Sequence, residues 1–250
     1  MCNQTGIKFG ERMLTSELIA GREVVEVGAL DVNGSLRSYV ESLAPGRYLG
    51  LDIELGPGVD EVVDAGELVA RYGAESFDVL ITTEMLEHVR DWPRIVSNLK
   101  RVVRPGGHLL LTTRSPGFPY HAHPYDFWRY TPDDMRQIFS DFEILTVESD
   151  TASPGVFLFA RRPADFVDQT RPLPLVSIIT GRRERSISDM TLRLFWLRRA
   201  VTERIPISGQ QVRRIARRMW SMAIRVRNAA WRALPLSVRS SVKRYVLRRG

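Results

Sequence analysis

The chain has 250 residues, of which 44% are apolar and 26% charged, a composition typical of a globular protein with room for one α/β domain and an appendage. No apolar run approaches the roughly 18 residues that a membrane-spanning helix needs, and residues 1–10 contain no apolar stretch typical of a signal peptide. Cys2 is the only cysteine, which excludes an intrachain disulfide. We therefore expect a cytoplasmic protein.

The net charge of +7 hides a strong asymmetry along the chain. Residues 1–160 carry 14 Lys and Arg against 24 Asp and Glu, a balance of −10, whereas residues 161–250 carry 22 against 5, a balance of +17. An acidic body followed by a basic tail indicates two regions under different constraints. We expect a first domain over residues 1–162, a linker over residues 163–185 and a basic helical extension over residues 186–250.

Short apolar runs alternate with amphipathic segments in the first half of the domain. The runs that predict strands are residues 24–28, 48–53, 61–63, 77–83 and 108–113. One helix is expected after the turn at residues 33–35, and another from Asp91 to the Pro105-Gly106-Gly107 segment, which we expect to end it. Strands that alternate with helices predict a parallel sheet covered by helices on both faces.

The pattern changes after residue 130. Thr131 can cap a helix that extends to Phe139, and residues 143–148 and 156–160 look like two strands joined by a tight turn. So short a connection requires an antiparallel pair. A parallel sheet that ends in an antiparallel hairpin, together with the absence of a Gly-x-Gly-x-x-Gly motif, disfavours a nicotinamide-dependent reductase.

Candidate binding residues lie at the carboxyl ends of the predicted strands, where open parallel sheets bind ligands. Gly28 follows the first strand and allows the backbone to approach a ligand closely. Asp52 ends the second strand, 24 residues further on, a spacing typical of a carboxylate that accepts hydrogen bonds from ribose hydroxyls. Asp64 follows the third strand and is a candidate acceptor for an adenine amino group. Each acid taken alone is as readily explained as a helix cap, but their order at successive strand ends favours a nucleoside site.

The order of these motifs resembles that of class I S-adenosylmethionine-dependent methyltransferases. The resemblance covers residues 20–162 and rests on Glu26-x-Gly28, Asp52, Asp64-Ala65, Phe77-Asp78, Leu86-Glu87-His88-Val89 and Arg104-Pro105-Gly106-Gly107. It implies an α/β, Rossmann-like fold with a mostly parallel seven-stranded sheet and an antiparallel last strand, and S-adenosyl-L-methionine as the cofactor. The residues that the resemblance places around the cofactor are Glu26, Gly28, Ala29, Leu30, Gly34, Asp52, Ile53, Asp64, Ala65, Thr83, Glu84 and His88.

The turn after the first strand departs from the family's pattern. Leu30 stands where the family usually has a second glycine, so Gly34 is a candidate for the close approach instead. This departure leaves open a non-catalytic, methyltransferase-like scaffold that acts through the Arg-rich tail. For His88, the resemblance favours a structural or cofactor-proximal role over a catalytic one.

Residues 116–131 form a long connection at the same edge of the sheet, rich in aromatic and titratable side chains. His121, His123 and Asp126 are candidate catalytic residues, since histidine or aspartate can act as a general base on a hydroxyl. The two histidines could instead be half a metal site, but the sequence fixes no third ligand, so no metal is predicted. The loop could also be structural, with Trp128 buried and Arg129 paired to an acid.

The basic tail contains two predicted helices, residues 187–204 and 210–234. The second has an apolar seam beside many arginines, a pattern typical of helices that lie on an anionic membrane and equally compatible with self-association or docking on the acidic body. No recognisable DNA- or RNA-binding module is present, which argues against nucleic acid. The sequence as a whole predicts O-methylation of a small-molecule or glycan hydroxyl, with N- or C-methylation as the alternative, by a cytoplasmic protein that could lie at the inner membrane surface.

Overall fold

The structure is a computed structural model and describes residues 4–121 and 125–203. The chain divides into two compact units, residues 1–191 and residues 192–250. Every strand of the described residues belongs to the first unit. The described part of the second unit is the end of helix α7 (Asp189–Glu203).

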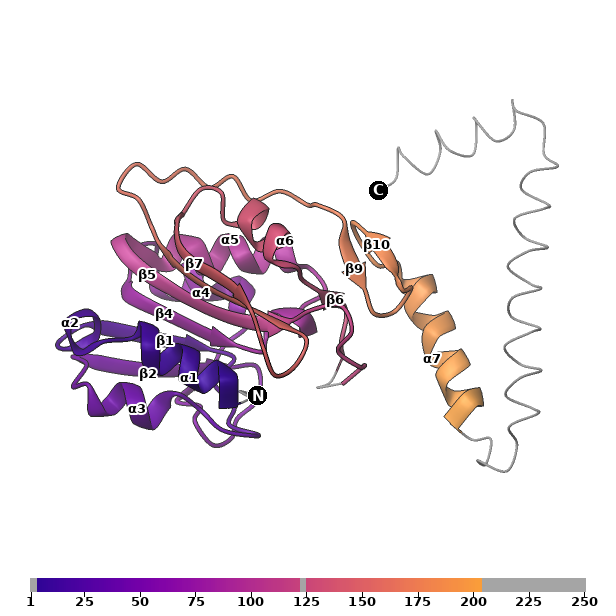
Figure 1. Cartoon of the computed structure of the whole chain (residues 1–250), viewed down its shortest axis with the longest axis horizontal. Coiled ribbons are helices and arrows are strands. Elements are labelled where there is room, and N and C mark those ends of the chain that lie inside the picture. The colour runs from indigo at the N-terminus through magenta and orange to yellow at the C-terminus, as the bar shows by residue number, and fades with distance from the viewer. Residues whose placement is uncertain (1–3, 122–124, 204–250) are drawn as a thin grey trace. The chain divides into compact units, whose positions relative to one another are not determined.

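Seven strands of the first unit form one sheet in the order β3-β2-β1-β4-β5-β8-β7 (Figure 1). These strands are β1 (Glu23–Val27), β2 (Arg47–Asp52), β3 (Glu61–Val62), β4 (Phe77–Thr83), β5 (Val103–Arg114), β7 (Glu143–Ser149) and β8 (Gly155–Arg161). Strands β1 to β5 pair in parallel, whereas β8 runs antiparallel to both β5 and β7. The predicted seven-stranded, mostly parallel sheet with an antiparallel last strand is confirmed.

Helices cover both faces of this sheet because its central strands are apolar on both sides. On one face, Val24, Ile81 and Leu110 pack with Phe9 of α1 and Val40 of α3. Their buried neighbours along the strands point to the opposite face, where α5 lies behind the sheet in Figure 1. The helices are α1 (Gln4–Met13), α2 (Ser16–Ile19), α3 (Arg37–Ser42), α4 (Leu68–Tyr72), α5 (Trp92–Val102) and α6 (Pro132–Ile138), with short 3-10 helices η1 (Ala65–Glu67) and η2 (Leu86–His88).

The ends of the helices follow the predicted signals only in part. Thr131 caps α6 as expected, in a capping box in which its hydroxyl and the Asp134 carboxylate each accept a backbone N–H. Asp91 precedes α5, but its side chain makes no capping hydrogen bond. Residues 105–107 lie inside β5 and do not separate helix from strand, because the Gly106 N–H pairs with a carbonyl just beyond β8.

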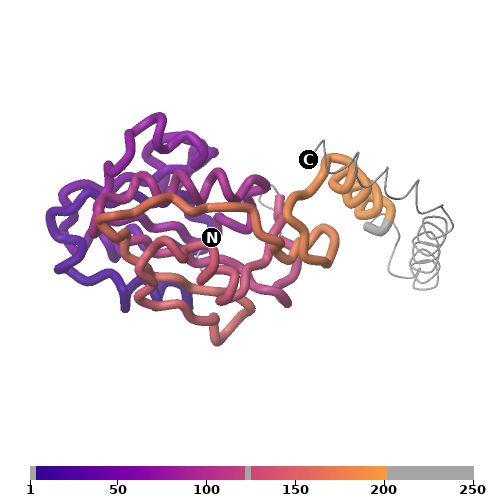
Figure 2. Tube along the Cα trace, turned by 90° about the horizontal axis from the view of Figure 1, so that it is seen from above, coloured from indigo at the N-terminus to yellow at the C-terminus, as the bar shows by residue number. Residues whose placement is uncertain are grey.

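Residues 162–174 run along the first unit from β8 to β9 (Figure 2), and polar side chains fix this segment in place. Lys100 of α5 is fully buried and donates to Asp141 Oδ2 and to Thr170 Oγ1, each at 2.9 Å. The Gln169 N–H donates to Asp141 Oδ2 at 2.9 Å. The segment expected as a linker therefore belongs to the first unit, because its polar groups pair with buried charges that composition does not reveal.

A second sheet joins the end of the 116–131 loop to residues 175–184. It has three strands in the order β10-β9-β6, and both pairs are antiparallel. Its strands are β6 (Trp128–Arg129), β9 (Leu175–Ser177) and β10 (Arg182–Glu184). Strand β9 thus holds the end of the loop by backbone hydrogen bonds, in a part of the chain where the sequence predicts neither β9 nor β10.

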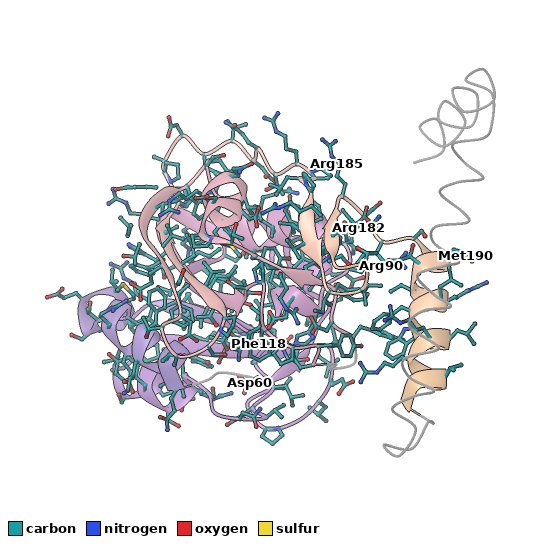
Figure 3. All side chains as sticks on the ribbon, turned by 45° about the vertical axis from the view of Figure 1, so that its right-hand side comes forward. Asp60, Arg90, Phe118, Arg182, Arg185 and Met190 are labelled. Carbon is teal, nitrogen blue, oxygen red and sulfur yellow. The ribbon has the colours of Figure 1, made fainter. Side chains whose placement is uncertain are left out.

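Helix α7 corresponds to the first helix expected in the tail, residues 187–204. Arg90 holds the residues at its start, donating from Nε to the Ile187 carbonyl at 2.9 Å and pairing with Asp189 at 2.7 Å; Figure 3 labels Arg90 and, on α7, Met190. Of the described helices, none combines the length and apolar character required to cross a bilayer. The second expected helix, residues 210–234, lies outside the described residues.

Candidate active site

A pocket of about 250 Å³ opens at the carboxyl ends of β1 to β4, the edge at which parallel sheets bind ligands. Its walls come from the turn after β1, the ends of β2 and β3, and the residues after β4. The lining residues are Val27, Gly28, Leu30, Val32, Asp52, Ile53, Glu54, Val63, Asp64, Ala65, Glu84, Met85, His88, Val89 and Ile95. Apolar side chains and four carboxylates therefore surround one space.

Eight of the twelve residues expected around the cofactor line this pocket. They are Gly28, Leu30, Asp52, Ile53, Asp64, Ala65, Glu84 and His88. The other four do not line it. Glu26, Ala29 and Thr83 are buried, and Glu26 accepts a hydrogen bond from the Tyr48 hydroxyl. The Gly34 N–H donates to the Asp31 carboxylate at 2.8 Å, within the turn that follows β1.

The turn after β1 approaches Met85, in the segment after β4, so closely that only glycine fits at its start. Gly28 has a φ of +82°, and a Cβ added there would lie 2.7 Å from Met85 Cβ. Leu30, which replaces the family's second glycine, lines the pocket and lies against Gly56, where an added Cβ would be 2.3 Å from Leu30 Cδ1. The larger side chain is thus accommodated by a glycine on the opposite segment.

Backbone hydrogen bonds orient the two acids at the ends of β2 and β3. Asp52 accepts from the Leu30 N–H at 3.1 Å and from the Glu54 N–H at 3.2 Å. Asp64 accepts from the Gly66 N–H at 2.6 Å, at the start of η1. Both acids therefore accept hydrogen bonds from local turns and also line the pocket. A capping role and a place in a nucleoside site are thus compatible for each acid.

Glu84, the first residue after β4, has an unusual backbone for its size. Its φ of 54° lies in the left-handed region, and its side chain is buried. Its carboxylate pairs with Arg114, whose guanidinium lies 4.0 Å from the centroid of the Phe118 ring. Burial and the nearby Glu87 carboxylate raise the pKa of Glu84 to about 8. Backbone strain and a shifted pKa at one position are features that concentrate at functional sites.

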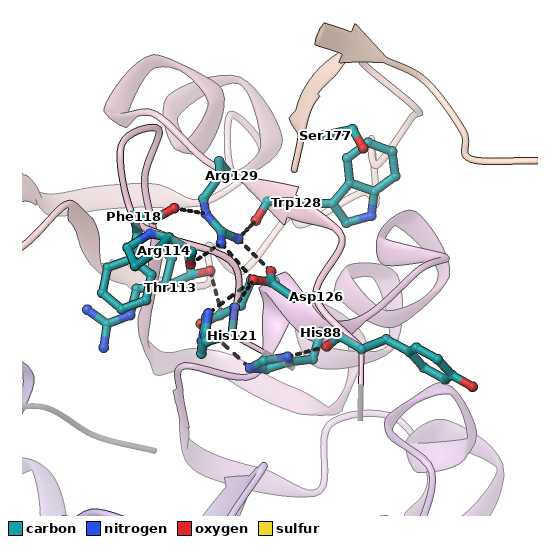
Figure 4. Close-up of polar contacts among 12 residues, drawn as sticks. His88, Thr113, Arg114, Phe118, His121, Asp126, Trp128, Arg129 and Ser177 are labelled. Atoms are coloured by element: carbon teal, nitrogen blue, oxygen red, sulfur yellow. Dashed lines mark hydrogen bonds and ion pairs between the residues drawn. The ribbon is translucent and has the colours of Figure 1, made fainter. Parts of the chain in front are cut away.

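Two segments distant in sequence bring Glu87, His88 and His121 together beside the pocket, a group we term the Glu87 cluster. Figure 4 labels its two histidines. Glu87 is fully buried, and its Oε2 accepts a hydrogen bond from Thr113 Oγ1 at 2.7 Å. Its Oε1 lies 3.6 Å from His121 Nε2 and 3.9 Å from His88 Nε2. His88 is the member of the Glu87 cluster that lines the pocket, so the cluster lies directly beside the pocket.

Asp126 connects this cluster to a buried ion pair. Its Oδ2 lies 3.1 Å from His121 Nδ1, and Arg129 donates to its two oxygens at 2.5 and 2.7 Å. Arg129 also donates to the Phe118 carbonyl at 3.3 Å, and Trp128 is fully buried. The expectation of a structural loop, with Trp128 buried and Arg129 paired to an acid, agrees with these contacts. The same contacts also position His121.

The charges in this network determine where protons reside. Burial raises the pKa of Asp126, but hydrogen bonds from Arg129 and His121 lower it to about 2. Burial lowers the pKa of His121, but the hydrogen bond to Asp126 and the negative charge of the nearby Glu87 carboxylate raise it to about 9. His121 therefore carries a proton at neutral pH in the ligand-free protein, whereas a general base must be free to accept one. His123, the other candidate base, lies outside the described residues.

Glu87 is a titratable site residue to which the sequence analysis assigns no role. A partial signal is present, because Glu87 directly precedes His88 in the motif that follows β4. The direction of its side chain depends on the η2 turn and on the hydrogen bond from Thr113 in β5. Neither of these can be deduced from residue spacing.

Residues 11–146 match the family model described as a methyltransferase domain. The chain is 27% identical over 192 residues to the phthiotriol/phenolphthiotriol dimycocerosates methyltransferase of Mycobacterium leprae (strain TN), covering 72% of this chain and 66% of that protein. It is 33% identical over 108 residues to the ubiquinone biosynthesis O-methyltransferase of Ralstonia nicotianae, covering 38% of this chain and 44% of that protein. The matched segments thus span less than two thirds of either relative's length.

One solved structure with a similar fold is the 1,6-didemethyltoxoflavin-N1-methyltransferase of Burkholderia thailandensis with bound 1,6-didemethyltoxoflavin and S-adenosylhomocysteine. The TM-score is 0.52 at 15% identity, over 64% of this chain and 80% of that chain, so the likeness concerns the fold alone. The family model, in contrast, covers more than half of the chain and agrees with the motifs and the strand order. The chain belongs to the class I S-adenosylmethionine-dependent methyltransferases.

Proposed function

We propose that the pocket binds S-adenosylmethionine and that the protein transfers its methyl group to a hydroxyl of a small molecule or glycan. The observation that carries this proposal is the position of His88, which lines the pocket and also belongs to the Glu87 cluster. Polar, titratable groups therefore border the cofactor space at the end of β4.

The carboxylates of the pocket and Gly28 support one orientation for the cofactor. Asp52, fixed by two backbone N–H groups, would accept hydrogen bonds from the ribose hydroxyls. Asp64 would lie near the adenine amino group, and Gly28 would allow the methionine portion to lie against the backbone. This orientation directs the sulfonium towards Glu84 and His88, on the side of the Glu87 cluster.

The acceptor would enter beside the 116–131 loop. Phe118 and His121 lie edge to face with ring centroids 4.9 Å apart, and Tyr125 is about half exposed. Aromatic surfaces of this kind suit the flat or ring-shaped portions of small molecules and sugars. His121 would lie beside the acceptor, and Asp126 would act as a positioning residue through His121.

Methyl transfer requires little more than alignment of the nucleophile with the methyl group and the sulfur. A hydroxyl is a poor nucleophile until it loses its proton. Polar side chains beside the cofactor would therefore assist methylation of a hydroxyl more than methylation of an amine. The name of the Ralstonia relative, an O-methyltransferase, also supports oxygen as the acceptor atom. N- and C-methylation remain the alternatives.

The test uses purified full-length protein with radiolabelled S-adenosylmethionine and a panel of phenols, aliphatic alcohols, glycans and matched amines. We expect label in hydroxyl-bearing acceptors, and no transfer by Gly28→Ala, whose extra methyl group would intrude on the turn. Transfer to amines alone would overturn the choice of oxygen. A folded protein that does not bind S-adenosylhomocysteine would overturn the enzymatic proposal and favour the scaffold alternative.

The tail and the location within the cell complete the proposal. We propose that the tail contacts an anionic membrane surface or another copy of the chain, and that the protein is cytoplasmic. Supporting this, α7 exposes apolar side chains at helical spacing, those of Met190, Leu194, Leu197 and Val201. Flotation with anionic vesicles should recover the protein at low salt and less of it at high salt. Absence from the vesicle fraction at low salt would remove the membrane alternative.

A further inference from the structure

The Glu87 cluster presents three metal-ligand groups to one point. One potential ligand atom from each of Glu87, His88 and His121 lies within 4.8 Å of the other two. Nitrogen and oxygen ligands of Zn²⁺ lie at about 2.0–2.2 Å, so that two donors on one ion are roughly 3–3.5 Å apart. The distances of 3.6 and 3.9 Å from Glu87 Oε1 to the two Nε2 atoms need only a small contraction to reach that spacing.

Both imidazoles are already oriented for ligation through Nε2. His121 Nδ1 faces Asp126 Oδ2 at 3.1 Å, and His88 Nδ1 faces the Tyr125 carbonyl oxygen at 2.5 Å. A carbonyl oxygen can only accept, so Nδ1 of His88 carries the proton and its Nε2 presents a lone pair. Acceptors of this kind behind Nδ1 are the usual outer-shell partners of metal-bound histidines.

Two polar atoms of the cluster are buried and have no hydrogen-bond partner in the described part of the chain. Among the described residues, neither Glu87 Oε1 nor His88 Nε2 has a hydrogen bond, although both are inaccessible to solvent. Buried polar groups are nearly always paired, because an unpaired one costs free energy. An unpaired oxygen and an unpaired nitrogen that face the same point indicate a bound group that both would contact.

We propose that Glu87, His88 and His121 bind a divalent first-row transition cation at the wall of the cofactor pocket. Two imidazoles and one carboxylate suit zinc, iron or cobalt better than magnesium or calcium, which prefer oxygen ligands alone. Three protein ligands leave positions open for oxygen atoms of a substrate. Among the described residues, Glu87 and His88 are the potential ligands that join His121.

The role of the cation in catalysis rests on the proposed function. A hydroxyl oxygen bound to the cation would lose its proton to solvent water more readily, because the positive charge stabilises the alkoxide. That oxygen would then form a bond to the methyl carbon of S-adenosylmethionine while the carbon–sulfur bond breaks and its electron pair stays on sulfur. The products are the methyl ether, S-adenosylhomocysteine and the released proton. The cation thus performs the task that the sequence analysis assigns to a histidine base.

Metal binding is measured first and without any acceptor. Tag-free full-length protein, stripped with a chelator, is titrated with Co²⁺ and followed by visible absorption, and with Zn²⁺ by calorimetry. Glu87→Gln and His121→Gln should each lose the site, and Asp126→Asn should weaken it roughly 10- to 100-fold through His121. His108→Gln is the matched control, since His108 lies in β5 against Phe159 and outside the cluster. Circular dichroism verifies that each variant is folded.

A separate titration with S-adenosylhomocysteine distinguishes failure of this inference from failure of the proposed function. Co²⁺ binding at one site, lost in Glu87→Gln and His121→Gln and retained in His108→Gln, supports the metal site whatever the acceptor. No Co²⁺ or Zn²⁺ binding by protein that binds S-adenosylhomocysteine overturns the metal site and leaves the methyltransferase proposal intact. Equal binding by all variants also overturns it, because the cation would then lie elsewhere.

Discussion

The buried Arg129–Asp126 pair offers a quantitative test of how the 116–131 loop is held. Both side chains are at most 1% exposed, and Arg129 makes two short hydrogen bonds to Asp126 besides those to loop carbonyls. Arg129→Met would leave the Asp126 carboxylate buried with His121 as its remaining charged partner. Breaking a buried ion pair by removing one partner costs about 3–5 kcal/mol. We expect a loss near the lower end of that range, because His121 compensates in part.

The assay is urea unfolding followed by tryptophan fluorescence, with Arg136→Met as a matched control. Arg136 pairs with Asp133 at 3.4 Å on the surface, where both side chains are more than half exposed, so its loss should cost less than about 1 kcal/mol. In the double variant Asp126→Asn/Arg129→Met, the cost should be well below the sum of the single costs, because no unpaired charge remains. Equal costs for Arg129→Met and Arg136→Met would refute the account of this loop.

Three further predictions concern other parts of the first unit. Gly28→Ala should abolish detectable cofactor binding, because the added Cβ would lie 2.7 Å from Met85 Cβ at a φ of +82°; calorimetry with S-adenosylhomocysteine checks this. Lys100→Met should destabilise the fold by about 3–5 kcal/mol in urea unfolding, because the buried Asp141 carboxylate loses its cation. Burial raises the pKa of Glu26 to about 7, so the folded state binds a proton that the unfolded state has released above its ordinary value of 4.5. The free energy of unfolding should therefore fall by about 3 kcal/mol as pH rises from 4.5 to above 7, and Glu26→Gln should lack this decrease.

Each of these predictions has an opposite outcome that would contradict it. Wild-type affinity in Gly28→Ala would mean that the turn after β1 does not approach the cofactor. Unchanged stability in Lys100→Met would mean that residues 162–174 are not held by that lysine. A difference in stability between Glu26→Gln and wild type that stays constant with pH would mean that Glu26 is ionised in the folded state.

The fold could be predicted from the sequence where the spacing of apolar residues agrees with the burial of their side chains. Strand β4 is bounded as expected, because its apolar run is continuous and buried on both faces. The sequence pattern predicts no element over helix α1, which contains Gly6 and Gly10, two residues that disfavour helix. The structure shows why Gly10 is there: an added Cβ would lie 2.5 Å from Leu36, so close packing outweighs helix propensity.

The site could be predicted only where it follows from topology. The carboxyl ends of parallel strands meet at one edge, which is why Asp52 and Asp64 line one pocket as the strand order implies. The Glu87 cluster depends instead on contacts between η2 and a loop more than thirty residues later. Spacing along the chain gave His121 and His123 as a pair, whereas the described residues bring His121 to His88 and Glu87.

The measurement that tests the central claim most directly is the affinity of full-length protein for S-adenosylhomocysteine in wild type, Asp52→Ala and the surface control Asp133→Ala. Asp52→Ala removes a charged acceptor worth about 1.5–3 kcal/mol, which corresponds to roughly 10- to 150-fold weaker binding. Asp133 is 88% exposed on α6 and should leave the affinity unchanged. Wild-type binding that weakens only in Asp52→Ala would support a cofactor in this pocket with its ribose at the end of β2. No binding by folded wild type, or equal affinity in all three proteins, would contradict it.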